Sequence, residues 1–278
     1  MSVRSGDVAG ALGLDVVAPC AGGEFGATHV RDRAGRDLVL KLVHDIEWAT
    51  RGAGIAGRVR ARGYPAPEYV DVGTLGEQGY TVQELRPGTV PDVMTVAYVD
   101  QLLDLVPLHA GVVPEGAGWV EEFVTGLRGE AAWPQHDAAR EVAPAVVDEL
   151  VALGQRLDGL VLAENDAVHG DFHHRNYLAA DGRVTAVFDW EGARNGDCRF
   201  DAFVLAAWSR GVPHQSTPDA AARAWDRATA GVEPDALALF AGHLALRNLD
   251  FYARHNPDAL PWCFGTIEEI LGPCWRGR

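Results

Sequence analysis

Three oxygen-bearing side chains lie at short intervals in the middle of the chain, and together they could support phosphoryl transfer. Asp171 and Asn176 belong to residues 168–178, and Asp189 lies thirteen residues after Asn176. A carboxylate that orients a hydroxyl, an amide oxygen and a second carboxylate supply a base and two oxygen ligands for Mg²⁺. Each residue alone is equally typical of a turn, because Asp and Asn are common in loops. The three residues together favour a catalytic site.

Two short strands joined by a tight turn would position these side chains. Asp181-Gly182 is typical of a two-residue hairpin turn, and the apolar residues on both sides of it follow the pattern of buried strands. The positions that carry this pattern are Val168, Tyr177, Leu178, Val184, Ala186 and Phe188. We therefore expect Asp171, Asn176 and Asp189 to converge on one point.

This segment resembles the aminoglycoside phosphotransferase and choline kinase family, distant relatives of the protein kinases. The resemblance rests on His-Gly-Asp, four residues, Asn, and then a hydrophobic-flanked Asp-Trp. It implies that Asp171 is the catalytic base, that Asn176 and Asp189 hold magnesium, and that His169 supports the loop by hydrogen bonds. It also implies an α+β, two-lobed protein-kinase-like fold with a small antiparallel-sheet N-lobe and a larger, mainly helical C-lobe.

The sequence contains a single lysine, Lys41, against 23 arginines. Lys41 lies within residues 38–43, a strand-like run whose other members are apolar. A compact ammonium at this one place suggests a site that needs a point charge instead of a planar guanidinium, such as a contact to the α and β phosphates of a nucleotide. The alternative is a chance exposed lysine at a strand edge. The family's phosphate-binding lysine occupies this strand, which favours the first interpretation.

Two further segments are candidates for nucleotide binding. Gly22 and Gly23 lie between two predicted strands, where glycines allow the backbone to approach phosphates closely. Their spacing fits neither the dinucleotide nor the Walker pattern, so an ordinary hairpin turn is equally consistent with the residues. The resemblance places the phosphate loop here, and it places the adenine-binding hinge at Gln83 and Leu85.

A helix is predicted over residues 45–62, where Gly and Pro residues then end it. In the kinase-like fold, a glutamate of this helix pairs with the strand lysine. The acidic candidates are Asp45 and Glu47, and Glu47 lies about one turn earlier than we expect. Three glycines weaken the helix and suggest that it is bent or mobile; they are Gly52, Gly54 and Gly57.

The chain of 278 residues is long enough for one large core or two lobes. We expect a nucleotide-binding lobe over residues 1–85 and a lobe over residues 86–278 with the catalytic loop, metal site and acceptor pocket. Helical periodicity dominates from Val96 onward. No run of eighteen apolar residues and no signal peptide is found, so we expect a cytoplasmic protein without a membrane partner. The four cysteines form no Cys-x-x-Cys pair, which argues against a zinc ribbon or a disulfide framework.

The net charge of −15 is concentrated in one part of the sequence. Residues 64–170, which we call the acidic block, carry four basic and eighteen acidic residues, a balance of −14. Such a field would attract a cationic small molecule, although a solvated surface that serves solubility is the alternative. Nucleic acid is an unfavourable partner, because phosphate contacts need clustered Lys and Arg.

These observations predict an O-phosphotransferase that uses ATP or GTP with Mg²⁺. The resemblance and the acidic block favour a small cationic antibiotic as acceptor, either an aminoglycoside or a basic cyclic peptide of the viomycin and capreomycin type. Two alternatives remain open at this point. One is a metabolic kinase that acts on choline, homoserine or a sugar, and the other is a catalytically silent module that binds nucleotide.

Overall fold

The chain folds into two compact units, each described here by itself. The structure is a computed structural model that describes residues 4–20, 26–114 and 118–276. The sheet unit comprises Met1–Pro91, His169–Asp171 and Arg175–Arg194, and the helical unit comprises Asp92–Val168, Phe172–His174 and Asn195–Arg278. In this division, the segment that carries Asp171, Asn176 and Asp189 belongs mainly to the same unit as the N-terminal part of the chain.

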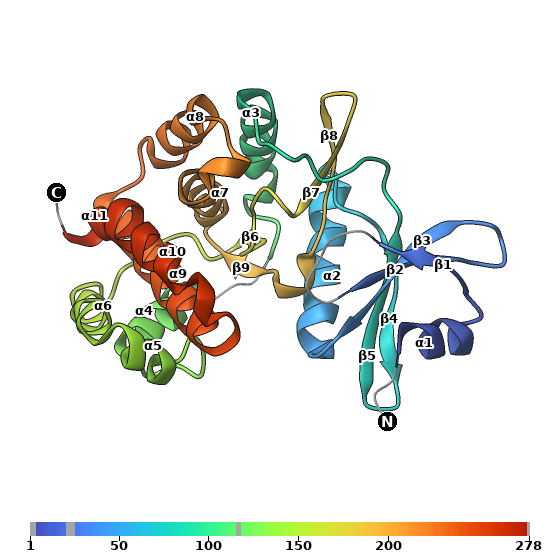
Figure 1. Ribbon diagram of the computed structural model, residues 1–278, viewed down its shortest axis with the longest axis horizontal. Helices are drawn as coiled ribbons and strands as arrows, with labels where there is room; N and C mark the ends of the chain where they lie inside the picture. Colours follow the sequence, from blue (N-terminus) through green and yellow to red (C-terminus); the bar gives the residue numbers. More distant parts are fainter. Residues whose placement is uncertain (1–3, 21–25, 115–117, 277–278) are drawn as a thin grey trace. The chain divides into compact units, whose positions relative to one another are not determined.

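The sheet unit is built on a five-stranded antiparallel sheet with the strand order β1-β2-β3-β5-β4 (Figure 1). Two helices accompany it. The elements are α1 (Ser5–Leu12), β1 (Asp15–Pro19), β2 (Ala27–Arg31), β3 (Asp37–Val43), α2 (Ile46–Ala61), β4 (Tyr69–Leu75) and β5 (Gln78–Glu84). The antiparallel sheet confirms the α+β class predicted for this part of the sequence.

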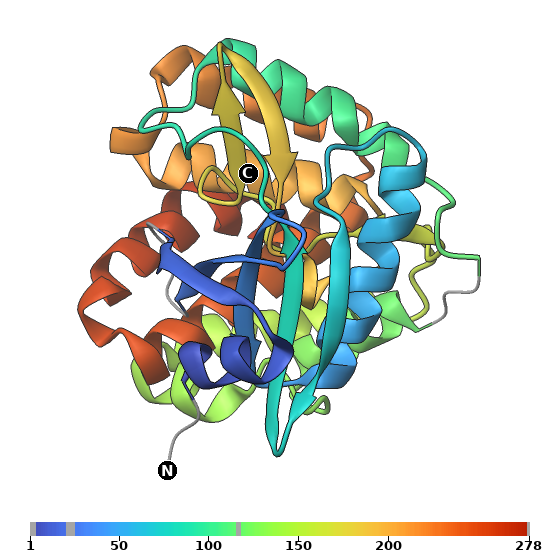
Figure 2. The same ribbon diagram turned by 90° about the vertical axis from the view of Figure 1, so that its right-hand side faces the viewer.

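The side chains of strand β3 alternate between an apolar face of the sheet and the face that carries Lys41. Leu38 and Leu40 are buried in a cluster with Val8 and Ala9 of α1, which lies beside the sheet (Figure 2). Because successive side chains of a strand point to opposite faces, Lys41 lies on the other face from Leu40. The alternation along β3 therefore directs the ammonium away from the small apolar core.

Helix α2 runs without interruption over Ile46–Ala61, close to the predicted range. The Asp45 side chain caps its first turn by accepting a hydrogen bond from the Trp48 amide at 2.9 Å. The helix is continuous through its three glycines, and one of them, Gly52, has a packing role. A Cβ atom at Gly52 would lie 2.0 Å from the carbonyl oxygen of Trp190, so only glycine allows this close approach.

We expect Gly52→Ala to destabilise the protein by about 1–3 kcal/mol, because the added methyl group would force α2 away from the Trp190 backbone. Gly54→Ala is a matched control in the same helix, since a Cβ atom there meets nothing within 4 Å. Alanine at this exposed position should stabilise the helix by about 0.5–1 kcal/mol. Denaturant unfolding of both variants checks the prediction, and equal effects of the two substitutions would contradict it.

The sheet unit also contains a hairpin of β7 (Tyr177–Ala180) and β8 (Arg183–Val187), followed by a short 3-10 turn, η2 (Trp190–Gly192). Asp181 and Gly182 both have positive φ, 50° and 73°, which confirms the predicted two-residue turn. The hairpin is tied to the segment after β5, because Thr89 and Ala179 exchange backbone hydrogen bonds at 2.9 and 3.1 Å. These bonds explain why the hairpin belongs to the sheet unit.

The helical unit contains the helices from α3 to α11, many of which pack around one apolar core. The core contains residues from α4, α6, α7 and α9, including Phe123, Leu150, Phe203 and Leu244. Its elements are α3 (Val96–Leu105), η1 (Val106–His109), α4 (Trp119–Arg128), α5 (His136–Val142), α6 (Pro144–Arg156), β6 (Asp166–Val168), β9 (Arg194–Gly196), α7 (Arg199–Gly211), η3 (Pro213–Gln215), α8 (Pro218–Thr229), α9 (Pro234–His255), η4 (Pro257–Ala259), α10 (Leu260–Thr266), η5 (Ile267–Leu271) and α11 (Gly272–Arg276).

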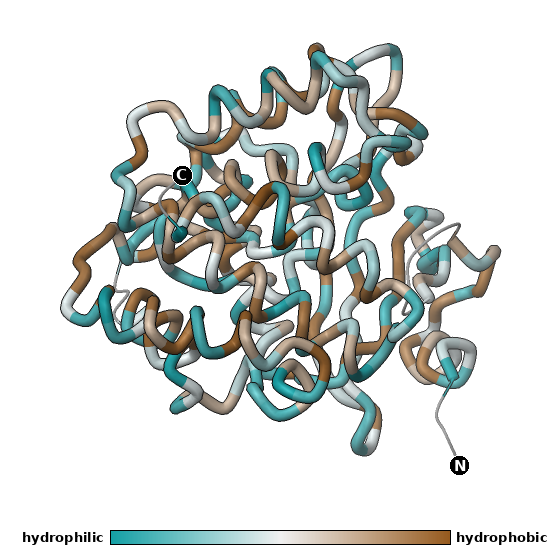
Figure 3. The backbone as a smooth tube through the Cα atoms, turned by 60° about the vertical axis from the view of Figure 1, so that its left-hand side comes forward, coloured by the Kyte–Doolittle hydropathy of each residue, from teal (hydrophilic) through white to brown (hydrophobic). Residues whose placement is uncertain are grey.

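Hydropathy along the backbone is mixed within the helices (Figure 3). Within the described residues, no helix combines the length and the apolar character that a membrane crossing requires.

Candidate active site

The loop between β6 and β7 brings Asp171 and Asn176 together. The Asn176 side-chain amide donates to the Asp171 backbone oxygen at 2.8 Å and to the Asp171 carboxylate at 3.0 Å. Asn176 is buried, whereas the Asp171 side chain is partly exposed. The two bonds fix the orientation of both side chains, so that the Asp171 carboxylate has a defined place in the loop.

His169 connects this loop to the segment that carries Asp189. Its Nε2 atom lies 2.8 Å from the Phe188 carbonyl oxygen, and its Nδ1 atom accepts a hydrogen bond from the Asp171 amide at 3.3 Å. These two contacts are consistent with a neutral ring protonated at Nε2. The ring also packs edge-on against the buried Trp190, at 4.7 Å between centroids. His169 therefore touches both predicted catalytic segments and has no arrangement typical of a zinc ligand.

Lys41 reaches the same region from strand β3. Its Nζ atom lies 2.7 Å from Asp189 Oδ1 and 3.1 Å from Glu191 Oε1. The expected partner on α2, Glu47, is exposed in the first turn of the helix. Among the described residues, the ion pairs of Lys41 go to Asp189 and Glu191. The glutamate that faces the lysine thus comes from η2 and not from the helix.

Sequence reasoning missed Glu191 as a member of this site. One signal was available, because an acidic residue stands two positions after the predicted metal ligand Asp189. This signal is weak by itself, since glutamate is common after a turn. The ion pair of Lys41 and Glu191 depends on a contact between β3 and η2, two elements that lie far apart in the sequence.

Lys41, Asp189 and Glu191 shift one another's pKa values. Burial lowers the pKa of Lys41, but the charges of Asp189 and Glu191 outweigh burial and raise it. Burial also raises the pKa of Asp189, yet the nearby Lys41 charge lowers it overall. Burial, together with the charge of Asp189, raises the pKa of Glu191 to about 7. Lys41 and Asp189 are therefore a charged pair at neutral pH.

The oxygen atoms of Asn176 and Asp189 are suited to a magnesium ion. Mg²⁺ prefers carboxylate and amide oxygens over nitrogen or sulfur. Since the Nδ2 atom of Asn176 is committed to Asp171, its Oδ1 atom is the one that can face a cation. Asp189 has a left-handed backbone, with φ 71° and ψ 50°, and 42 % of its side chain is exposed. The donor set and its exposure fit the ion that the resemblance implies.

The structure describes two of the four other predicted nucleotide-binding residues. Gly22 and Gly23 lie outside the described residues. Gln83 is buried in β5, where it pairs with Val39 of β3 and Tyr69 of β4. The Leu85 amide donates a long hydrogen bond of 3.4 Å to the Asp37 carbonyl. In this structure, the backbone amide of Leu85 is therefore directed towards β3.

The helical unit contains an aromatic group that includes a residue of the catalytic loop. Trp208 of α7 and Trp262 of α10 stack with centroids 5.2 Å apart and an interplanar angle of 24°. Tyr252 packs edge-on against Trp262 at 5.3 Å, and His173 lies 5.0 Å from Trp208. All four side chains are partly exposed, so they form an aromatic surface. His173 follows Asp171 by two positions in the sequence.

Among the described residues of the acidic block, at least nine carboxylates are paired with arginines, which reduces the predicted attraction for a cationic partner. Several of these arginines come from outside the block. The paired carboxylates are Glu68, Glu84, Asp100, Asp104, Glu121, Glu130, Asp148, Glu149 and Asp158. The sequence count of charges thus overstates the negative charge that this block presents to solvent.

A second cluster of possible metal ligands has a structural explanation. Asp166, Asp197 and Cys198 have ligand atoms within 4.8 Å of one another. Asp166 accepts a hydrogen bond from the Cys198 amide at 3.2 Å, and Asp197 accepts several from the Arg199 guanidinium, the shortest at 2.6 Å. Burial and the neighbouring Asp166 raise the pKa of the Cys198 thiol, which disfavours the thiolate that binds metals. These bonds give both aspartates structural partners in this cluster.

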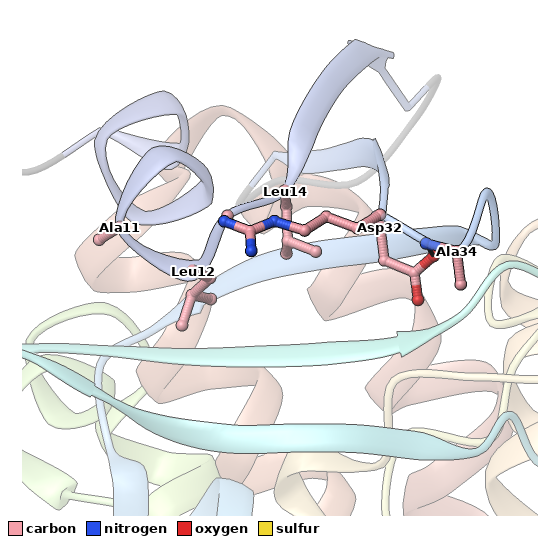
Figure 4. A pocket seen from close by; sticks show the side chains of 7 residues that line it. Ala11, Leu12, Leu14, Asp32 and Ala34 are labelled. Atoms are coloured by element: carbon pink, nitrogen blue, oxygen red, sulfur yellow. Dashed lines mark hydrogen bonds between the residues drawn. The ribbon is translucent and has the colours of Figure 1, made fainter.

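A surface pocket of about 450 Å³ lies in the sheet unit, away from the predicted site residues (Figure 4). It is lined by Ala11, Leu12, Gly13, Leu14, Asp32, Arg33 and Ala34. Asp32 accepts hydrogen bonds from the Ala34 and Arg36 amides, at 2.9 and 2.8 Å. Its carboxylate thus stabilises the turn between β2 and β3.

Comparison with known proteins identifies related sequences and structures. A model described as the phosphotransferase enzyme family matches residues 17–240. Hygromycin-B 4-O-kinase of Escherichia coli is 26% identical over 202 residues, which cover 64% of this chain. The match covers 58% of that relative's own length.

Solved structures share the fold. A thermostable mutant of aminoglycoside phosphotransferase APH(4)-Ia, in a ternary complex with ADP and hygromycin B, has a TM-score of 0.74 at 19% identity and 98% coverage of both chains. Amicoumacin kinase hAmiN, in complex with AMP-PNP, Ca²⁺ and Ami, has a TM-score of 0.63 at 17% identity, with 95% of this chain and 93% of that chain covered. These likenesses confirm the predicted kinase-like fold.

Proposed function

Because this chain belongs to the phosphotransferase enzyme family, we propose that it transfers the terminal phosphate of ATP to a hydroxyl group of a small antibiotic. The observation that carries the proposal is the arrangement of two pairs in the sheet unit. Asn176 orients the Asp171 carboxylate at 3.0 Å, and Lys41 contacts Asp189 at 2.7 Å. A base, two oxygen ligands and a phosphate-binding ammonium are thus supplied by one compact unit.

Each residue has a defined part in the proposed reaction. Asp171 accepts a hydrogen bond from the acceptor hydroxyl and takes its proton as the new phosphate ester forms. Lys41 holds the α and β phosphates. Mg²⁺, held by Asn176 and Asp189, would neutralise the charge of the phosphate oxygens. The nucleotide contacts proposed for Gly22, Gly23, Gln83 and Leu85 rest on the resemblance alone, and GTP is an alternative to ATP.

An antibiotic acceptor is favoured by the relatives, since one phosphorylates hygromycin B according to its name and another is an amicoumacin kinase. The net charge of −15 supports an acceptor with amino groups, such as an aminoglycoside or a basic cyclic peptide. The aromatic surface of Trp208, Trp262 and Tyr252 offers flat faces on which sugar or aryl rings could stack.

The catalytically silent alternative loses its one supporting feature. That feature was the absence of a suitable glutamate on α2. Glu191 lies 3.1 Å from Lys41 and provides the carboxylate from another element. This contact supports the catalytic function over the silent alternative.

An assay of ADP release over a panel of acceptors tests the proposal. The panel contains hygromycin B, other aminoglycosides, amicoumacin, capreomycin, choline and homoserine. We expect at least one antibiotic to raise ADP release about 10-fold or more above the acceptor-free rate, because only a bound hydroxyl completes the site. Growth of a susceptible host that expresses the protein should be protected against the same compound. Stimulation by choline or homoserine alone would contradict the antibiotic assignment.

A further inference from the structure

We infer that Glu191 is a positioning residue for Lys41, in the place that a helix glutamate takes in kinase-like folds. The inference rests on the proposed function and extends it, because it names the group that holds the phosphate-binding lysine. Glu191 has no role in the nucleotide, metal or base assignments above. Its carboxylate is nevertheless one of the two that face the only lysine of the chain.

The surroundings of Glu191 hold its carboxylate in one place. Its Oε1 atom lies 3.1 Å from Lys41 Nζ and 3.4 Å from the hydroxyl of Thr81, which donates to it. Thr81 is fully buried on β5 and pairs with Lys41 in the sheet register, so the two strands present both groups to the same oxygen. The side chains of Lys41 and Glu191 are 17% and 15% exposed. A carboxylate with these contacts is a fixed partner and not a surface ion pair.

Tyr69 of β4 lies close enough to Glu191 and Asp189 to feel their charges. Burial and the charges of Glu191 and Asp189 raise the pKa of Tyr69 well above its usual value. The phenol therefore stays neutral at physiological pH. Three strands of the sheet, β3, β5 and β4, thus contribute one residue each to the environment of Glu191.

Asp189 cannot serve as the permanent partner of Lys41 if it also holds the metal. A carboxylate that binds a cation has less negative charge to offer to a nearby ammonium. Glu191 would then remain as the carboxylate that keeps Lys41 extended towards the phosphates. In the absence of nucleotide, the ammonium of Lys41 faces both carboxylates, with Asp189 at 2.7 Å and Glu191 at 3.1 Å.

Helix α2 takes part in this arrangement through its backbone contact. Gly52 approaches the Trp190 carbonyl so closely that a Cβ atom would lie 3.0 Å from the Glu191 Cα atom. The Trp190 ring is buried, and its Nε1 atom donates to the Val187 carbonyl at 2.9 Å. The helix therefore supports the η2 turn, and the turn supplies the glutamate that faces Lys41, whereas Glu47 of the helix is exposed.

A double-mutant cycle on nucleotide binding tests the inference without an acceptor. The affinity for AMP-PNP with Mg²⁺ is measured for the wild type, Glu191→Gln, Lys41→Ala and the double variant. We expect Glu191→Gln to weaken binding about 10-fold, a size typical of residues that orient a ligand-binding group. In the Lys41→Ala background, the same change should alter affinity by less than about 2-fold, because its effect passes through Lys41. Independent, multiplicative effects would overturn the inference.

The magnesium dependence of binding distinguishes a positioning role from metal ligation. The Mg²⁺ concentration at half-maximal nucleotide binding should be the same in Glu191→Gln and the wild type, and a 10-fold rise would make Glu191 a metal ligand instead.

A conservative variant and a control complete the test. Glu191→Asp keeps the carboxylate and should recover part of the affinity; no recovery would also count against the inference. Glu47→Gln is the matched control and should leave binding unchanged. A wild type that binds no AMP-PNP would refute the proposed function, an outcome distinct from an additive cycle.

Discussion

Replacement of Asp171 by Asn is expected to lower the rate of phosphate transfer by about 10²–10⁴-fold, the usual contribution of a positioned general base. The substitution keeps an oxygen that can accept the hydrogen bond from the Asn176 amide, now at 3.0 Å. The loop should therefore retain its conformation. Because Lys41 and Asp189 are unchanged, nucleotide affinity should stay within about 2-fold of the wild type.

Measurement of kcat with a saturating acceptor, together with the affinity for AMP-PNP, checks this prediction. Asp181→Asn is the matched control, since Asp181 is an exposed turn residue with φ 50°, a conformation that Asn also adopts. The control should keep full activity. A fully active Asp171→Asn enzyme would show that another group accepts the proton.

Replacement of Asp189 by Asn is expected to lower activity by about 10³-fold, because a metal ion contributes several kcal/mol to the stabilisation of charge in the transition state. Its effect should differ from that of Asp171→Asn in one respect. The wild type should bind AMP-PNP more tightly in Mg²⁺ than in EDTA, and this difference should disappear in Asp189→Asn. In EDTA the variant should resemble the wild type, since Lys41 retains Glu191 at 3.1 Å.

Calorimetric titrations of AMP-PNP in Mg²⁺ and in EDTA provide the four affinities that this prediction needs. The EDTA titration is also the control for folding, because a misfolded variant would lose nucleotide binding under both conditions. An undiminished magnesium effect in Asp189→Asn would refute the assignment of Asp189 as a metal ligand.

The parts of the fold that local sequence determines were predictable. Asp181-Gly182 indicated a two-residue turn because both positions have positive φ, and the structure confirms it. Helix α2 was predicted from its breakers and lies within one residue of the expected ends. The strand-like run over residues 38–43 forms most of β3 (Asp37–Val43), the strand that carries Lys41. Each of these inferences uses residues that are neighbours in the sequence.

The features that depend on distant contacts were not predictable. Glu191 faces Lys41 because η2 packs against α2 and the sheet, and no local pattern records this contact. Gly52 was interpreted as a weak point of the helix, whereas its role is the close approach to Trp190. In both cases the partner of the residue lies on another element.

The acidic block shows the same limit for charge. A count along the sequence cannot show that Asp100 and Asp104 pair with Arg227, or that Glu149 pairs with Arg276. These arginines belong to later helices. Net charge therefore predicted the sign of the field and not the side chains that produce it.

The discontinuous make-up of the sheet unit has a consequence for recombination between related genes. A single crossover near residue 91 would join Lys41 from one parent to Asp171, Asn176 and Asp189 from the other, although these residues lie in one compact unit. Exchange of residues 92–168 and 195–278 as two cassettes would instead inherit that machinery from one parent. A hybrid made in this way would replace the aromatic residues Trp208, Tyr252 and Trp262 while keeping the residues of the sheet unit, so its acceptor preference would show which unit selects the proposed acceptor.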